Sequence, residues 1–275
     1  MTLPHFAIAG TQKGGTTWLE HQLAQHPGVF TPRRQLHFFD VNYGRGLDWY
    51  RAQFAKAAPG QILGEKTTEY FDTEHGDLVP RRIAESLPGL KTIVILRNPV
   101  RRATSALQHK VNSGLEPLPR DPNEILFADM DRPPERRWRY VERGFYDRQL
   151  DAFYRHLDPA DVLVLIFEED IVADPESCWA RVCDFIGVDH VPARTLGQPV
   201  NRVRLSPAAI HLSRLFFNVP YARGAIRRAD GFLGLTPWQP RFSEATLARL
   251  RTLYAPHNEA LFEMLRRRIP AWEGA

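Results

Sequence analysis

Short apolar runs alternate with amphipathic stretches over most of the chain. Segments rich in apolar or β-branched residues, typical of strands buried on both faces, lie at 6–10, 91–96 and 161–167, and 62–66 is a further short strand candidate. Apolar positions at helical spacing predict helices over 16–25, 47–56, 77–87, 101–111, 144–157 and 175–186. The alternation of strand and helix predicts an α/β fold with a parallel sheet that is covered by helices on both faces.

Three other stretches have weaker patterns. The polar, proline-rich segment 113–138 predicts a long loop, which either closes over a binding site as a lid or is unstructured. Within 188–242, apolar residues recur at helical spacing: Leu212, Leu215, Phe216 and Val219. We expect this helix to face the core, and an amphipathic helix for a membrane or a partner is the alternative. Residues 243–268 predict a final pair of helices with an aromatic face.

The composition is that of a folded protein with a substantial core. The chain has 275 residues, of which 43% are hydrophobic and 25% charged, and we expect a single domain over 1–275. Its net charge of +4 suits an anionic ligand but is too small to indicate a nucleic-acid partner. No apolar run reaches the length of a transmembrane helix. Cys178 and Cys183 have neither disulfide nor metal-ligand spacing, which favours a reducing, cytoplasmic compartment and no metal.

A glycine turn joins the first strand to the first helix. It reads Gly10-Thr-Gln-Lys13-Gly14-Gly15-Thr-Thr17. A turn of this kind presents free backbone amides and the positive end of a helix dipole, and both favour phosphate. Gly14 and Gly15 can adopt backbone angles that other residues resist, and Lys13 adds a positive charge. The turn therefore predicts an anion-binding site.

The turn departs from the triphosphate-binding pattern G-x-x-x-x-G-K-[ST]. Thr16 occupies the position of the lysine, and Lys13 lies three residues earlier. A nucleotide with one 5′-phosphate and a transferable group suits this turn better than a triphosphate with magnesium. A nucleotide kinase or NTPase remains the alternative function.

Cations follow three of the predicted strands. Lys13, Lys66 and Arg97 each stand at or just beyond the end of a strand. Because ligands of parallel α/β sheets bind at the carboxyl ends of the strands, we expect these side chains to lie near one site. Arginine offers a planar fork that matches phosphate oxygens, so Arg97 predicts a second phosphate site.

With these motifs in view, the chain resembles the sulfotransferases that use 3′-phosphoadenosine-5′-phosphosulfate (PAPS). It is most similar to the branch with the heparan sulfate and bacterial carbohydrate sulfotransferases. Residues 11–19 resemble the family's 5′-phosphosulfate loop, and residues 96–105 its 3′-phosphate segment. The resemblance implies a P-loop-like three-layer fold and metal-free, in-line transfer of a sulfuryl group. The acceptor would be a hydroxyl or amine of a saccharide, lipid or other alcohol, the second product would be 3′,5′-adenosine bisphosphate, and 113–138 would shape the choice of acceptor.

The resemblance also implies roles for individual residues. It assigns cofactor binding to Gln12, Lys13, Gly14, Gly15, Thr16, Thr17, Trp18, Arg97 and Ser105. Arg97 and Ser105 would hold the 3′-phosphate, and Lys13 would stabilise the leaving oxygen. Trp18 is an equally good candidate for the core. Adenine contacts are expected from the region after the strand at 161–167 and near residues 201–204.

The catalytic base is the point where the chain departs from the family. The heparan sulfate branch usually has a glutamate at the position of Gln35, and glutamine cannot accept a proton near neutral pH. In an extended segment, His37 would point to the same face as Gln35. Our hypothesis is that His37 is the base and Gln35 orients the acceptor or a water. A structural role for His37 is the alternative.

Further candidates surround this position. Lys66 resembles a family lysine near the reacting centre, so it is a third catalytic candidate with Lys13 and His37. Alternative bases are Asp40, Glu65 and Glu69. The missing glutamate also leaves open a catalytically impaired protein that binds PAPS or its product.

Overall fold

The computed structural model describes residues 3–192, 196, 205–217, 219 and 221–273. Contacts between Cα atoms divide the chain into two compact units. The first comprises Met1–Asn98, Phe145–Val200 and Pro256–Ala275, and the second comprises Pro99–Gly144 and Asn201–Ala255. The single domain expected over 1–275 stays a prediction, because compact units need not fold independently.

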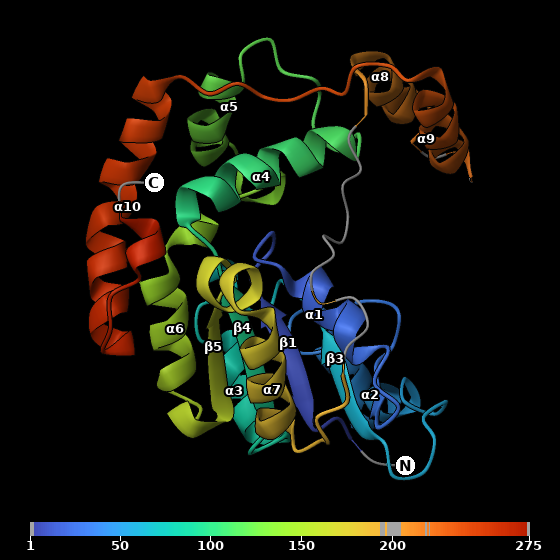
Figure 1. The fold of residues 1–275 in the computed structure, drawn as a ribbon, viewed down its shortest axis with the longest axis vertical. Coiled ribbons are helices and arrows are strands. Elements are labelled where there is room, and N and C mark those ends of the chain that lie inside the picture. The colour runs from blue at the N-terminus through green and yellow to red at the C-terminus, as the bar shows by residue number, and fades with distance from the viewer. Residues whose placement is uncertain (1–2, 193–195, 197–204, 218, 220, 274–275) are drawn as a thin grey trace. The chain divides into compact units, whose positions relative to one another are not determined.

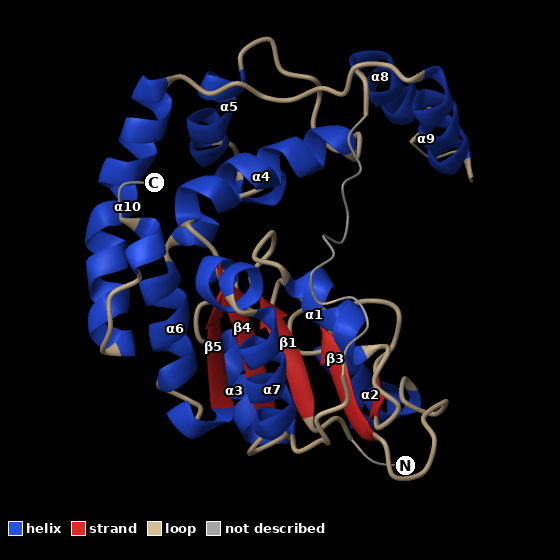
Figure 2. Cartoon of the chain, in the orientation of Figure 1, coloured by secondary structure: helices blue, strands red, loops and turns tan. Residues whose placement is uncertain are grey.

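The first unit is built on a parallel sheet, as the sequence predicts (Figure 2). Its strands are β1 (Phe6–Gly10), β2 (Val29–Phe30), β3 (Ile62–Lys66), β4 (Lys91–Leu96) and β5 (Val162–Ile166). Their order is β2-β3-β1-β4-β5, and every neighbouring pair runs parallel.

Helices cover both faces of this sheet and give three layers (Figure 1). Alternate residues of β1 enter different clusters, with Phe6 and Ile8 in one and Ala7 and Ala9 in the other. The cluster with Phe6 and Ile8 is completed by α1 (Thr16–Leu23) and α7 (Pro175–Ile186). The other face is covered by α2 (Gly46–Ala52), α3 (Leu78–Ser86), α6 (Tyr146–Tyr154) and the end of α10 (Glu244–Leu265). Burial on both faces explains why β1, β5 and most of β4 consist of apolar or small residues.

The sheet order brings three strand ends together. β1 lies between β3 and β4, so the chain first continues to one side of β1 and later crosses to the other. The position where strand order reverses is where parallel α/β sheets bind ligands. The glycine turn follows β1 and Arg97 follows β4 at this edge, and Lys66 is the last residue of β3.

The second unit is helical. It contains α4 (Pro99–Asn112), α5 (Pro122–Ala128), α8 (Pro207–Leu215), α9 (Ala222–Leu233) and the first part of α10. The expectation of a loop over 113–138 is wrong, because α5 lies within it. Asp121 caps this helix by accepting a hydrogen bond from the amide of Asn123 at 2.8 Å, and Pro122 occupies the first helical position. Proline is favoured at that position, so prolines here mark a helix start as well as turns.

Two more expectations for the C-terminal part are wrong. Residues 244–265 form one helix, α10, rather than a pair, and Pro256 lies inside it. Burial of Leu250 and Tyr254 before the proline, and of Leu261 after it, outweighs the hydrogen bond that proline cannot donate. The apolar residues spaced along 212–219 do not face the core: Leu215 is 77% exposed.

Candidate active site

The turn after β1 has the geometry of an anion site. Gly15 caps α1 with φ 113°, and the amide of Gly14 donates to the carbonyl of Thr11 at 2.8 Å. In the part of the chain that the structure describes, the amides of Gly15, Thr16 and Thr17 donate to no protein acceptor. Three unsatisfied amides at a helix N-terminus form a concave set of donors for an oxyanion.

The two central glycines let this turn lie directly against neighbouring backbone. A Cβ on Gly14 would lie 2.3 Å from the carbonyl oxygen of Ile95, at the end of β4. A Cβ on Gly15 would lie 2.7 Å from the ring of Phe167, and its φ of 113° is one that residues with a Cβ avoid. A side chain at position 14 must therefore move the turn away from the end of β4, and one at position 15 must displace the turn or the ring of Phe167.

Gly14→Ala is expected to lower the free energy of unfolding by about 1–3 kcal/mol, because the methyl group has no space beside a main-chain oxygen. It should also weaken binding of 3′,5′-adenosine bisphosphate, since the amides next to it move. Denaturant unfolding and calorimetric titration measure the two effects. Gly44→Ala is the control, because a Cβ there meets nothing within 4 Å. Unfolding and binding like those of the unsubstituted protein in Gly14→Ala would contradict the close packing of the turn.

Lys13 and Arg97 lie beside one another across the ends of β1 and β4. Arg97 donates from Nη1 to the carbonyl of Lys13 at 3.3 Å, and its guanidinium lies over the ring of Phe167, 4.9 Å from the centroid. The hydroxyl of Tyr146 holds the Arg97 carbonyl at 2.8 Å. Burial lowers the pKa of Lys13, and the positive charge of Arg97 lowers it further. A bound anion with more than one negative charge relieves this repulsion.

The other assigned nucleotide residues are placed less uniformly. Gln12 is half-buried in the turn. Trp18 is 6% exposed in the core, and its Nε1 donates to the carbonyl of Leu196 at 3.0 Å, which fits its alternative role. Ser105 is half-buried on α4, in the second unit. The segment expected to contact adenine, 201–204, lies outside the described residues.

Lys66 has a partner that the sequence did not reveal. It forms an ion pair with Glu20, which lies one helical turn after Thr16 on α1. The two side chains are 15% and 23% exposed, so solvent screens the pair only partly. Glu20 therefore balances the charge of Lys66, whereas the described residues include no ion-pair partner for Lys13. The only sequence signal for this ion pair was the carboxylate of Glu20, one helical turn after the glycine turn.

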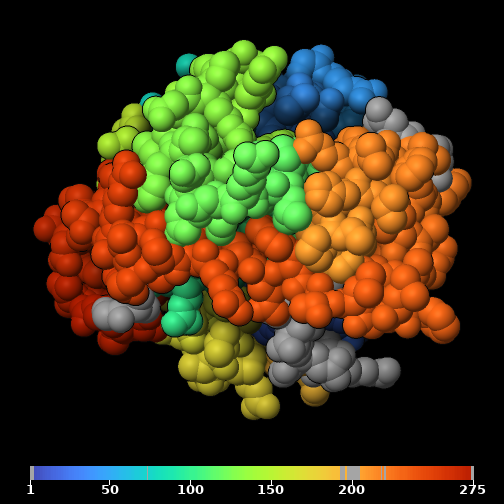
Figure 3. Space-filling view, turned by 90° about the horizontal axis from the view of Figure 1, so that it is seen from above, coloured from blue at the N-terminus to red at the C-terminus, as the bar shows by residue number. Residues whose placement is uncertain are grey.

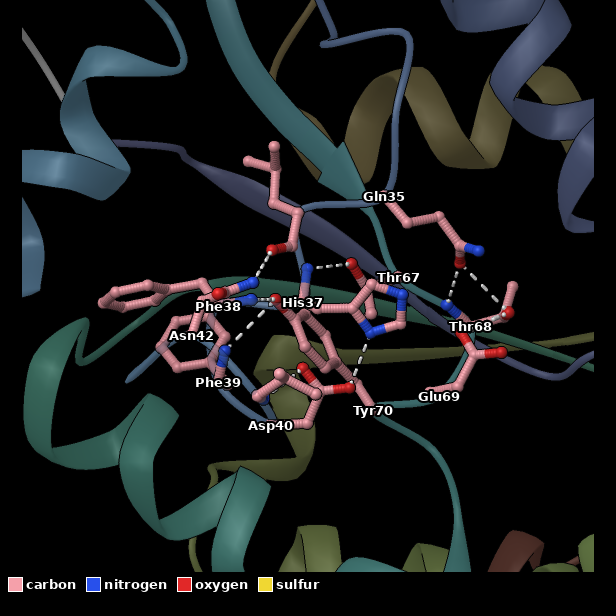
Figure 4. A network of polar contacts seen from close by, with 12 residues as sticks. Gln35, His37, Phe38, Phe39, Asp40, Asn42, Thr67, Thr68, Glu69 and Tyr70 are labelled. Carbon is pink, nitrogen blue, oxygen red and sulfur yellow. Dashed lines mark hydrogen bonds and ion pairs between the residues drawn. The ribbon is translucent and has the colours of Figure 1, made fainter. Parts of the chain in front are cut away.

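His37 forms a pair with Asp40. Its Nδ1 lies 2.8 Å from Oδ2 of Asp40, whose side chain is 2% exposed (Figure 4). We assign the proton to Nδ1, facing the carboxylate, which leaves the Nε2 lone pair available. The hydrogen bond to Asp40 raises the pKa of His37, burial acts against this, and the charges of Asp40, Glu69 and Glu65 add to the increase. Burial alone would raise the pKa of Asp40, but hydrogen bonds from His37 and the Val41 amide outweigh it and lower that pKa.

Gln35 and His37 both contact the segment after β3. Oε1 of Gln35 accepts from the amide of Thr68 at 2.8 Å and from its hydroxyl at 3.2 Å, and the amide of His37 donates to Oγ1 of Thr67 at 3.2 Å (Figure 4). The expectation of an extended segment is wrong at His37, where φ is 49°. Gln35 and His37 therefore contact the same segment, Thr67–Thr68, through these hydrogen bonds and not because alternate residues of a strand share a face. With Oε1 engaged, Gln35 has its NH₂ group to offer as a donor.

Glu65 is a structural residue rather than an alternative base. It is fully buried and accepts from the hydroxyls of Tyr50 at 2.6 Å, Tyr70 at 2.7 Å and Thr67 at 2.8 Å. The Tyr70 hydroxyl also accepts from the amide of Phe38 at 2.8 Å. This network fastens the turn that carries His37 to the end of β3.

These residues fit a doubly phosphorylated nucleotide. The free amides of Gly15, Thr16 and Thr17 and the cations of Lys13 and Arg97 lie at adjacent strand ends. Two groups of anion-binding donors match a ligand with phosphates on both sides of its ribose. Among the described residues, no group of three or more histidine, cysteine, aspartate or glutamate side chains is placed to hold a metal ion.

Comparison with known sequences identifies the family. The model of the sulfotransferase domain matches residues 3–200. Mouse heparan sulfate glucosamine 3-O-sulfotransferase 6 is 32% identical over 270 residues, which cover 95% of this chain and 71% of that protein. Mouse heparan sulfate glucosamine 3-O-sulfotransferase 3A1 is 29% identical over 99% of this chain and 65% of its own length. The kinase or NTPase alternative is not favoured.

Solved structures agree on the fold. A sulfotransferase from Alicyclobacillus acidocaldarius superposes with a TM-score of 0.70 at 22% identity and covers 99% of both chains. Mouse sulfotransferase SULT7A1, solved with PAP, gives a TM-score of 0.52 at 15% identity over 97% of this chain and 86% of its own. The chain with the glycine turn, Lys13 and Arg97 therefore belongs to the sulfotransferase family, enzymes that transfer a sulfuryl group from PAPS.

Proposed function

We propose that this sulfotransferase transfers the sulfuryl group to a hydroxyl of a saccharide and that His37 is its general base. The observation that carries the proposal is the hydrogen-bonded pair of His37 and Asp40. The amide of His37 is bonded to Thr67, just after β3, and β3 is the neighbour of β1, the strand that leads into the glycine turn. The relatives named as heparan sulfate glucosamine 3-O-sulfotransferases, 32% and 29% identical, support a saccharide as the acceptor.

The donor side of the reaction uses the strand ends of β1 and β4. PAPS, when bound, supplies a sulfuryl group on a phosphate leaving group. The amides of Gly15, Thr16 and Thr17 would bind the 5′-phosphate, and the fork of Arg97 would bind the 3′-phosphate. Lys13 supplies positive charge for the leaving oxygen as its bond to sulfur breaks. Arg97 donates to the Lys13 carbonyl, so the two sites are held in register.

The acceptor side uses the residues around the end of β3. Nε2 of His37 takes the proton of the acceptor hydroxyl as the acceptor oxygen bonds to sulfur. Asp40 holds the ring by Nδ1 and stabilises the imidazolium that forms. The NH₂ group of Gln35, with Oε1 fixed by Thr68, donates to an acceptor oxygen. Lys66, balanced by Glu20, lies at the same strand end and contacts an acidic group of the acceptor.

The pH dependence of kcat/KM is expected to be bell-shaped, because it reports the free enzyme's base and acid. Activity rises as His37 loses its proton, above the usual pKa of 6.5, since Asp40 raises it. Activity falls as Lys13 loses its proton, below the usual 10.5, because of burial and Arg97. In Asp40→Asn the rising limb should move to lower pH. If the rising limb of the kcat/KM profile stays at the same pH in Asp40→Asn, the limb does not report the ionisation of His37 paired with Asp40.

A screen for sulfated products tests the function directly. The protein is incubated with ³⁵S-labelled PAPS and separate panels of sugars, phenols, lipids and small alcohols, and products are identified by mass spectrometry. We expect a sulfated saccharide hydroxyl. Transfer only to phenols would overturn the acceptor class. Tight binding of 3′,5′-adenosine bisphosphate without sulfation of any acceptor would favour the alternative function, a catalytically impaired protein that binds PAPS or its product.

A cytoplasmic location stays part of the proposal. It is supported by the cysteines Cys178 and Cys183, which are both free and buried. Burial raises the pKa of the two thiols to about 12 and about 11, so both are protonated at neutral pH. Fractionation of the native host, with detection of the protein in cytosol and membrane fractions, measures the location.

A further inference from the structure

The hairpin of α8 and α9, residues 205–235, exposes an unusual amount of apolar surface. The described residues include twelve exposed large apolar side chains, and nine of them lie between 212 and 235. Leu215 is 77% exposed, Tyr221 93% and Phe232 91%. Figure 3 shows atoms of this segment, in orange, at the surface. A concentration of exposed apolar side chains in one short segment favours an interaction site over a solvated face.

All the exposed charges of the hairpin are positive. They are the guanidinium groups of Arg214, Arg223, Arg227 and Arg228. The only acidic residue of the segment, Asp230, is buried. Arg223 lies over the ring of Phe217, 4.9 Å from its centroid, so cationic and aromatic groups share one surface. Among the described residues, none of these arginines has an ion-pair partner.

The hairpin is held together from within. Asp230 of α9 accepts hydrogen bonds from the hydroxyl of Ser206 and from its amide, the latter at 3.0 Å. Ser206 in turn caps α8 by accepting from the amide of Ala209 at 3.2 Å. The small face of α8, with Ala209 and Ser213, is buried. The apolar side chains are therefore not needed to join the two helices and remain available to a partner.

The presence of both apolar and positively charged side chains on the hairpin distinguishes between three possible binding partners. An acidic saccharide would use the arginines but not the exposed phenylalanines and leucines. A second copy of the chain would bring arginines against arginines, which is unfavourable without acids to separate them. An anionic lipid surface uses both kinds of group, because apolar side chains enter the boundary of the acyl chains while arginines contact phosphates.

We propose that the α8–α9 hairpin binds the surface of membranes that contain anionic lipids. Phe232, Leu233 and Leu215 enter the boundary of the acyl chains, and Arg227 and Arg228 contact the headgroups. Within the described residues, no helix has the length and apolar character needed to cross a bilayer. This attachment does not depend on the acceptor proposed above.

Sedimentation of the full chain with vesicles tests the proposal. Phosphatidylcholine vesicles with phosphatidylglycerol should bind the protein, and vesicles of phosphatidylcholine alone should bind it at least about tenfold more weakly, since each arginine near an anionic surface is worth about fivefold. Phe232→Ser with Leu233→Ser should lose binding to both. Arg227→Gln with Arg228→Gln should lose most of the preference for phosphatidylglycerol.

Val172→Ser is the matched control, because Val172 is 63% exposed on the first unit and Leu233 is 64% exposed on the hairpin. It should bind vesicles as the unsubstituted chain does. Unchanged thermal unfolding and unchanged sulfation of a soluble acceptor show that the variants are folded. A chain that sediments with neither vesicle overturns the proposal. So does light scattering that shows a dimer disrupted by Phe232→Ser with Leu233→Ser while vesicle binding is absent.

Discussion

Replacing His37 with alanine is expected to lower kcat by about 10²–10⁴-fold, the usual contribution of general acid–base catalysis. Binding of 3′,5′-adenosine bisphosphate should change little, because the ring of His37 is hydrogen-bonded to Asp40 and its amide to Thr67, after β3, rather than to the glycine turn. Single-turnover kinetics with labelled PAPS measures the chemical step, and calorimetric titration measures the nucleotide affinity.

Two further variants separate catalysis from structure at this position. His37→Gln keeps a hydrogen-bond donor for Asp40 but removes the base, so it should be nearly as slow as His37→Ala. Glu69→Gln removes one of the smaller causes of the raised His37 pKa and should leave most of the activity. Turnover in His37→Ala close to that of the unsubstituted enzyme would remove His37 from the mechanism and make it the structural histidine considered from the sequence.

Lys13→Ala is expected to lower kcat by about 10²–10³-fold, the cost of losing one donor that stabilises charge in the transition state. Nucleotide affinity should fall less, because the free amides of Gly15, Thr16 and Thr17 remain. Arg97→Ala should lower nucleotide affinity more than kcat, because the guanidinium group would bind the 3′-phosphate equally in the ground state and the transition state. Separate measurement of kcat and of nucleotide affinity resolves the two roles.

A lysine outside the site controls for the loss of charge. Lys56 is exposed, and Lys56→Ala should leave both kcat and affinity unchanged. Arg97→Lys tests the planar fork, because it keeps the charge but cannot bind two oxygens in parallel. If Lys13→Ala weakened binding and left kcat intact, while Arg97→Ala did the reverse, the two roles would have to be exchanged.

The sheet and the glycine turn were readable from the sequence. A strand buried on both faces is apolar along most of its length, so 91–96 could be located with the bounds that β4 has. The bounds 62–66 also match β3, although Glu65 and Lys66 end that strand. A glycine turn between strand and helix likewise depends on local backbone angles. Gly15, with φ 113°, needs no information from distant parts of the chain.

Other elements were predicted wrongly because proline and helical spacing of apolar residues are each compatible with more than one structure. Pro122 begins α5, although prolines in 113–138 suggested a loop, and Pro256 lies inside α10 without ending it. The spacing of Leu212 and Leu215 is helical, as expected, but spacing does not tell whether the apolar side of a helix meets the core or the solvent.

The sequence alone was sufficient for the alternation of strands and helices, the glycine turn with Lys13, and Arg97 beyond its strand, because each depends on residues close together in the chain. The pairing of Lys66 with Glu20, the burial of Glu65 among hydroxyls and the position of His37 on the segment after β3 required the tertiary structure. They depend on which strands become neighbours, and that order is decided by packing between segments far apart in sequence.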